Sequence, residues 1–175
     1  MSLWQDISDE LNQRTPSPPL HPESIWNETL SEKLCNISSK ELIGEGNPSE
    51  QVAQATRAGL LLWNDDLDAA HEIVQDMHQV IGSYWHAILH RREGDGDNAK
   101  YWFARVGQHP IFPSLHQQAA QLWPACKSWA KWSPNAFVDA VTEAVTFGEE
   151  NHPFGEALRQ IQVIEFKLLL QHGLA

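Results

Sequence analysis

Hydrophobic residues recur at helical spacing along most of the chain, and short polar segments interrupt this pattern. Spacings of three and four residues place such side chains on one face of a helix, whereas a half-buried strand requires alternation. The sequence contains no sustained alternation. The pattern therefore predicts an all-α fold, with its clearest helices over residues 48–63, 67–77, 80–93 and 97–106.

The segments on either side of these four helices also carry helical patterns, which prolines interrupt. Residues 2–13 predict a short amphipathic helix, and the four prolines in residues 15–22 predict an extended connection. Pro22 is expected to start a second helix, because the first helical turn accepts proline. Asn47 and Pro48 are the predicted cap and first residue of the helix that follows. Towards the C-terminus the predicted helices are residues 115–132 with a kink at Pro124, a helix from Pro134, and residues 154–171.

The chain has 175 residues, which is long enough for one domain with a core of its own. We expect a single all-α domain over residues 1–175. It would comprise an N-terminal arm over residues 1–47, two helix pairs over residues 48–110, and C-terminal helices over residues 111–175.

The four central helices form two similar pairs at an offset of 29 residues. At this offset Asp68-Ala69-Ala70 aligns with Asp97-Asn98-Ala99, so that each pair has a small alanine at the expected helix crossing. Residues 50–110 resemble tetratricopeptide and related short helical repeats, in which each helix pair buries its face on the next. In the first unit Asp65 stands where Gly94 forms the turn of the second. The resemblance implies a stack of helix pairs.

Residues 82–106, GSYWHAILHRREGDGDNAKYWFARV, resemble a motif shared by a family of proteins without an assigned activity. The resemblance extends from about Leu60 to the end of the chain. It implies a related helical fold and carries no reaction over.

The charge of the chain limits its partners. It has 23 acidic and 12 basic residues and a formal net charge of −11, so phosphate backbones are repelled and nucleic acid is not expected to bind.

No membrane association is expected, because no run approaches the roughly 18 apolar residues of a membrane span. The first residues also lack the features of a signal peptide. Cys35 and Cys126 are interpreted as free thiols of a cytoplasmic protein.

His86 and His90 lie four residues apart on the third central helix and therefore share one face. Two such imidazoles can bind one metal ion, and a zinc-type site would take its third ligand from Glu93 or from another helix. Ala87 stands where a zinc-protease helix has glutamate, so the spacing does not indicate that class. Both histidines can instead line a polar groove, form hydrogen bonds to neighbours or act as acid–base groups.

The fourth central helix places further polar and aromatic residues on one strip. Arg105 of this strip is expected to pair with a nearby acid such as Asp95 or Asp97. His71, Gln75 and His78 form another stripe, which we interpret as a solvated face. The predicted binding groove consists of Trp85, His86, His90, Glu93, Asn98, Tyr101 and Arg105.

Three hypotheses about function follow from these residues. The leading one is a helical-repeat module that binds or scaffolds a peptide or protein partner. The alternative is a metal-dependent or acid–base enzyme centred on His86 and His90. No cofactor is expected apart from the divalent metal ion that the metal-dependent form of this alternative would use. In the third, the chain associates with its own copy through exposed aromatic surface.

Overall fold

The computed structural model describes residues 2–44 and 49–174, and over these residues the chain is helical without β-strands. Ten α-helices and one short 3-10 helix account for the regular structure of this part of the chain. They are α1 Leu3–Asn12, α2 Glu28–Asn36, α3 Ser39–Ile43, α4 Glu50–Trp63, α5 Leu67–Val74, α6 Val80–Glu93, α7 Gly96–Val106, α8 Phe112–Leu122, η1 Pro124–Ser128, α9 Pro134–Thr146 and α10 Pro153–Gly173. The predicted all-α class is confirmed.

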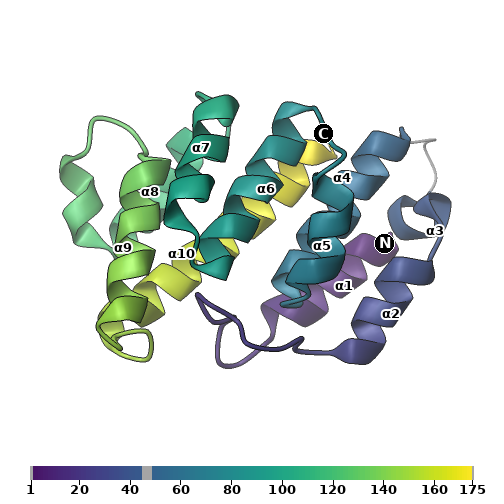
Figure 1. The fold of residues 1–175 in the computed structure, drawn as a ribbon, viewed down its shortest axis with the longest axis horizontal. Helices are drawn as coiled ribbons and strands as arrows, with labels where there is room; N and C mark the ends of the chain where they lie inside the picture. The colour runs from purple at the N-terminus through teal and green to yellow at the C-terminus, as the bar shows by residue number, and fades with distance from the viewer. Residues whose placement is uncertain (1, 45–48, 175) are drawn as a thin grey trace.

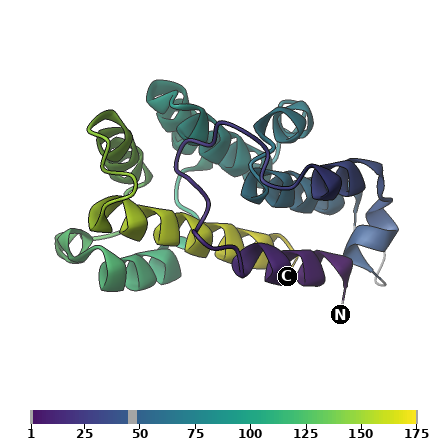
Figure 2. The same ribbon diagram turned by 90° about the horizontal axis from the view of Figure 1, so that it is seen from below.

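The central helices follow one another side by side, since α4 packs on α5, α5 on α6, and α6 on α7. The long α10 lies in a second layer together with α1 (Figures 1 and 2). Helix α4 contacts helices of both layers, and α9 contacts α7 and α10. Among the described residues no helix combines the length and apolar character that a membrane crossing requires.

The turns before α5 and α7 have the same backbone geometry. Asp65 and Gly94 occupy equivalent positions in the two turns. Both have positive φ angles, of 67° for Asp65 and 84° for Gly94. Asp66 and Asp95 follow them and cap the next helix, each accepting a hydrogen bond from a backbone N–H three residues on. Aspartate tolerates the left-handed conformation better than most residues, which explains why the first turn forms without glycine.

Several predicted helix boundaries are wrong, among them the end of the helix expected over residues 67–77, because α5 ends at Val74. Pro22 does not start a helix, because α2 begins at Glu28, where Asn27 caps it by accepting a hydrogen bond from the Leu30 N–H. The helix expected over residues 115–132 ends at Leu122, and Pro124 begins a separate 3-10 turn where a kink was expected. Asn47 and Pro48 lie outside the described residues, and α4 begins at Glu50 with Ser49 as its cap.

Large aromatic residues fill the core between the two layers. Trp85 of α6 is 1% exposed and lies beside Phe166 of α10, with the ring centroids 6.1 Å apart. Gly59 of α4 makes room for this indole, since a Cβ atom added there would lie 2.5 Å from Trp85 Cζ2. The close approach of α4, α6 and α10 therefore depends on a glycine at this one position.

The N-terminal segment before α2 is fixed to the helices by buried cations. Arg92 donates to the Pro19 carbonyl at 2.9 Å and pairs with Asp65 at 2.6 Å. Arg159 of α10 donates through Nε to the Ser17 carbonyl at 3.0 Å. Because both guanidinium groups are buried, their hydrogen bonds are expected to be stronger than those of surface pairs. The proline-rich connection thus has a defined path across the bundle.

Candidate metal centre

Three histidines from two neighbouring helices come together on the face formed by α5, α6 and α7. His71 comes from α5, and His86 and His90 come from successive turns of α6. One ring nitrogen from each residue lies within 4.8 Å of those of the other two. The ring centroids are 4.7 Å apart for His86 and His90, 5.1 Å for His71 and His86, and 5.7 Å for His71 and His90. This spacing is compatible with small movements of the rings onto one ion.

His86 is held in the form that binds metal. Its side chain is buried and its Nδ1 atom has no hydrogen-bond partner among the described residues. Burial lowers the pKa of His86 to about 4, with further lowering by His90 and His71. The imidazole is therefore neutral at pH 7 and keeps a lone pair available as a ligand.

His90 has partners on both of its ring nitrogens. Nδ1 lies 2.9 Å from Oε2 of Glu93, one turn further along α6. Nε2 lies 3.2 Å from Nδ2 of Asn98 in the first turn of α7. Because a carboxylate only accepts and an amide nitrogen only donates, the neutral ring carries its proton on Nδ1 and its lone pair on Nε2. This is the tautomer in which metal-binding histidines are commonly held by a carboxylate.

The residues of the predicted groove divide between this site and the core. His90 contacts Glu93 and Asn98 through the hydrogen bonds above, and its ring stacks on that of His86. Trp85 is not a groove residue, because its position on the opposite side of α6 buries it against α10. Glu93 hydrogen-bonds to His90 and is not among the three residues whose ligand atoms converge.

Tyr101 and Arg105 lie on the outer side of α7, next to Trp102. Tyr101 is 56% exposed and meets Trp102 edge-on. The predicted ion pair between Arg105 and Asp95 or Asp97 does not form in the described part of the chain. The guanidinium lies instead over the Trp102 ring, 5.3 Å from its centroid. Stacking on an aromatic face thus replaces the expected carboxylate contact.

His71 belongs to the centre, although the polar stripe that it shares with Gln75 and His78 predicts a solvated face. It is half-buried and contacts both histidines of α6. The connection between α5 and α6 has only five residues, which makes the two helices neighbours in space. That short connection is the signal that could have placed a histidine of α5 opposite the histidine pair of α6.

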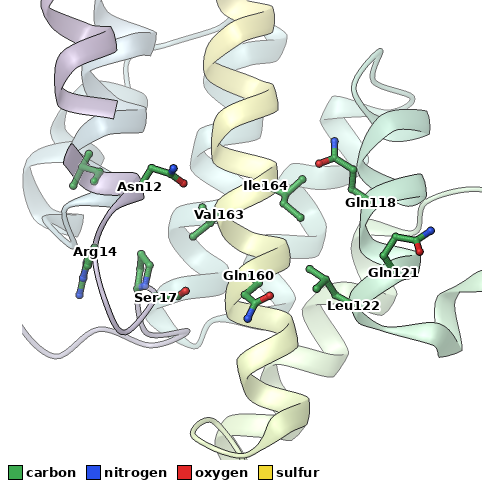
Figure 3. A pocket seen from close by; sticks show the side chains of 11 residues that line it. Asn12, Arg14, Ser17, Gln118, Gln121, Leu122, Gln160, Val163 and Ile164 are labelled. Atoms are coloured by element: carbon green, nitrogen blue, oxygen red, sulfur yellow. The ribbon is translucent and has the colours of Figure 1, made fainter. Parts of the chain in front are cut away.

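An apolar cavity lies away from the histidines, between α1, α8 and α10. It has a volume of about 460 Å³ and an apolar floor formed partly by Val163 and Ile164. Figure 3 shows these two α10 residues between Asn12 on one side and Gln118 on the other. Its lining contains no carboxylate or histidine, so it offers no metal ligands of these types. The wall of a polar cavity of about 650 Å³ includes Glu93 but none of the three histidines.

Comparison of the chain with models of protein families, with curated proteins and with solved structures finds no significant match.

Proposed function

We propose that the protein binds one divalent transition-metal ion through His71, His86 and His90. The observation that carries this proposal is the convergence of three imidazole nitrogens within 4.8 Å. One of these rings, that of His86, has a buried nitrogen that finds no hydrogen-bond partner in the part of the chain that the structure describes. A buried polar atom without a partner costs free energy, and a bound ion would remove that cost. The all-nitrogen ligand set suits zinc and the neighbouring first-row metals better than calcium or magnesium.

A metal ion with three histidine ligands would keep a coordination position for a water molecule or a substrate. Catalytic zinc sites typically have three protein ligands and a water molecule in the fourth position, whereas structural sites have four protein ligands. Metal coordination lowers the pKa of such a water to about 7, which makes it a nucleophile at neutral pH. The reaction class supported by the ligand set is therefore a metal-assisted hydrolysis or hydration.

Metal titration of the purified protein tests this proposal. Wild-type protein stripped with a chelator is expected to bind one Zn²⁺ or Co²⁺ per chain in isothermal titration calorimetry. The Co²⁺ complex is expected to show the visible absorption of a four- or five-coordinate site. His71→Ala, His86→Ala and His90→Ala should each abolish the stoichiometric binding.

His78→Ala is the matched control, because His78 is exposed and lies between α5 and α6, outside the three-histidine group. It should bind metal as the wild type does. Failure of the wild-type protein to bind either ion would remove the metal centre, and equal losses in His78→Ala and His86→Ala would show that binding is unspecific.

A second candidate function is a binding module whose helix pairs present α7 to a peptide or protein partner. The exposed Tyr101 and the guanidinium of Arg105, which has no acidic partner in the described residues, favour it. The matching turn geometry before α5 and α7 supports a tetratricopeptide-like repeat of the two pairs. A photoreactive residue at position 101 can identify such a partner by cross-linking. The partner should bind the variant Tyr101→Ala/Arg105→Ala more weakly than the wild type, and His86→Ala as tightly as the wild type. Sedimentation of the protein alone separates this case from self-association, since the monomer has a mass of 19.8 kDa.

A further inference from the structure

The two nitrogens of His90 have partners with opposite consequences for metal binding. We propose that Glu93 and Asn98 are positioning residues of the centre, Glu93 strengthening and Asn98 weakening its hold on a metal ion. This inference rests on the proposed metal centre and adds two residues that do not themselves bind the ion.

Glu93 prepares His90 for coordination. Its Oε2 accepts a hydrogen bond from the Nδ1–H group, with 2.9 Å between the nitrogen and the oxygen, which fixes the tautomer and the orientation of the ring. The carboxylate side chain is 33% exposed, while the imidazole side chain is 8% exposed. A negative charge at the edge of the buried ring increases the electron density that Nε2 offers to a cation. Carboxylate partners of this kind typically change metal affinity by about 10–100-fold.

Asn98 acts on the nitrogen that a metal ion would use. Its amide donates to the Nε2 lone pair at 3.2 Å. The residue is held in place independently of its side chain, because its backbone N–H donates to the capping carboxylate of Asp95. An ion that coordinates Nε2 has to break the Asn98 hydrogen bond first. A neutral hydrogen bond of this kind contributes little net free energy, which corresponds to a change in affinity of up to about tenfold.

The same ring is therefore subject to two opposed effects. Removing the Glu93 carboxylate should lower the affinity of the centre for a metal ion, and removing the Asn98 amide should raise it. A purely structural role for either residue predicts a different pattern, since damage to the local fold would weaken binding in both cases.

Competition with a chromogenic zinc chelator at one fixed pH measures both effects on the full chain. Glu93→Ala is expected to weaken Zn²⁺ binding by about 10–100-fold. Glu93→Gln should weaken it by less, because its amide oxygen can still accept a hydrogen bond from the Nδ1–H group. Asn98→Ala is expected to tighten binding by up to about tenfold. Thermal melting of the metal-free variants establishes that each is folded.

Glu143→Gln and Asn135→Ala are the matched controls, because both residues are exposed on α9. Neither should change the zinc affinity. Loss of affinity in Asn98→Ala, or unchanged affinity in Glu93→Ala or Asn98→Ala, would overturn the inference while leaving the metal centre intact. Absence of zinc binding in the wild-type protein would overturn the metal centre and this inference with it.

Discussion

The imidazole of His86 stacks on the indole of Trp102, with ring centroids 4.0 Å apart and planes inclined by 19°. The contact joins α6 to α7 at the edge of the histidine cluster, and Arg105 stacks on the same indole. Trp102 therefore shields one face of His86 from water, although it is itself only half-buried. This shielding helps to explain why the pKa of His86 is lowered to about 4.

Truncation of the tryptophan should expose His86 and destabilise the pairing of α6 with α7. Trp102→Ala is expected to lower the free energy of unfolding by about 1–3 kcal/mol, less than a fully buried tryptophan would lose. Trp102→Phe keeps an aromatic face against His86 and should cost less than about 1.5 kcal/mol. Urea unfolding curves measure both values. Equal losses in the two variants would show that stacking on His86 contributes nothing specific.

The buried ion pair between α6 and α10 should be the most sensitive polar contact of the fold. Glu165 is fully buried, lies 2.6 Å from Nη2 of Arg91 and accepts a hydrogen bond from the Tyr84 hydroxyl at 2.9 Å. Glu165→Gln would leave the Arg91 charge buried without its counter-charge, and we expect a loss of about 3–5 kcal/mol.

Two further variants are compared with Glu165→Gln by the free energy of unfolding, measured from urea unfolding curves. Tyr84→Phe removes one hydrogen bond and should lose about 1–3 kcal/mol, because one carboxylate oxygen is left without this donor. Glu156→Gln is on the exposed side of α10 and should change stability by less than about 0.5 kcal/mol. A Glu165→Gln variant as stable as Glu156→Gln would contradict the assigned ion pair.

The packing of α4 on α6 and α10 should depend on the absence of a side chain at Gly59. An alanine Cβ there would lie 2.5 Å from Trp85 and 2.9 Å from a methyl group of Leu170. Gly59→Ala is therefore expected to destabilise the protein by about 1–3 kcal/mol, despite the better helix propensity of alanine. Gly96→Ala is the control, since its Cβ would meet no atom nearer than 3.4 Å. The melting temperatures of both variants measure this effect, and Gly59→Ala should melt at a lower temperature than Gly96→Ala if the helices cross this closely.

The stability of the fold should fall in mild acid because of His109. This side chain is buried against Tyr84 of α6, Phe112 of α8 and His172 of α10. Burial, followed by the charge of His172, lowers the pKa of His109 to about 4 from an ordinary 6.5. Between these two pH values the unfolded chain binds more protons than the folded chain, so stability decreases as the pH falls from 6.5 towards 4.

We expect this one group to contribute on the order of 1–3 kcal/mol to the loss. His109→Gln should flatten the dependence of the melting temperature on pH in this window, while the exposed His78→Gln should leave it unchanged. An identical pH dependence in wild type and His109→Gln would contradict the buried neutral state of His109.

Local patterns predict the central helices well because each has its own apolar stripe, and because α4, α5 and α7 each have a side-chain cap at the N-terminus. The turns at Asp65 and Gly94 illustrate this, since both are followed by an aspartate that caps the next helix. The prediction of a helix from Pro22 is wrong, although the surroundings of this proline satisfy the rules for a first helical turn. Tertiary hydrogen bonds to the segment before it, from Arg92 and Arg159, hold this region extended instead.

The candidate site could be predicted only in part, because a single helix determines the relation between His86 and His90 but not their distance from His71. His71 shares a stripe with Gln75 and His78, and that stripe has the polarity of a solvated surface. Only the packing of α5 on α6 turns its first member towards the histidine pair. Trp85 shows the opposite error. It precedes His86 in the sequence and is therefore predicted in the same groove, but its side chain is buried in the core.

Anomalous X-ray scattering from crystals grown with Zn²⁺ tests the central claim most directly. Data collected on either side of the zinc absorption edge should show one strong peak per chain, within coordination distance of a nitrogen from each of His71, His86 and His90. A difference map without density among these three rings, at a zinc concentration that saturates binding in solution, would contradict the account.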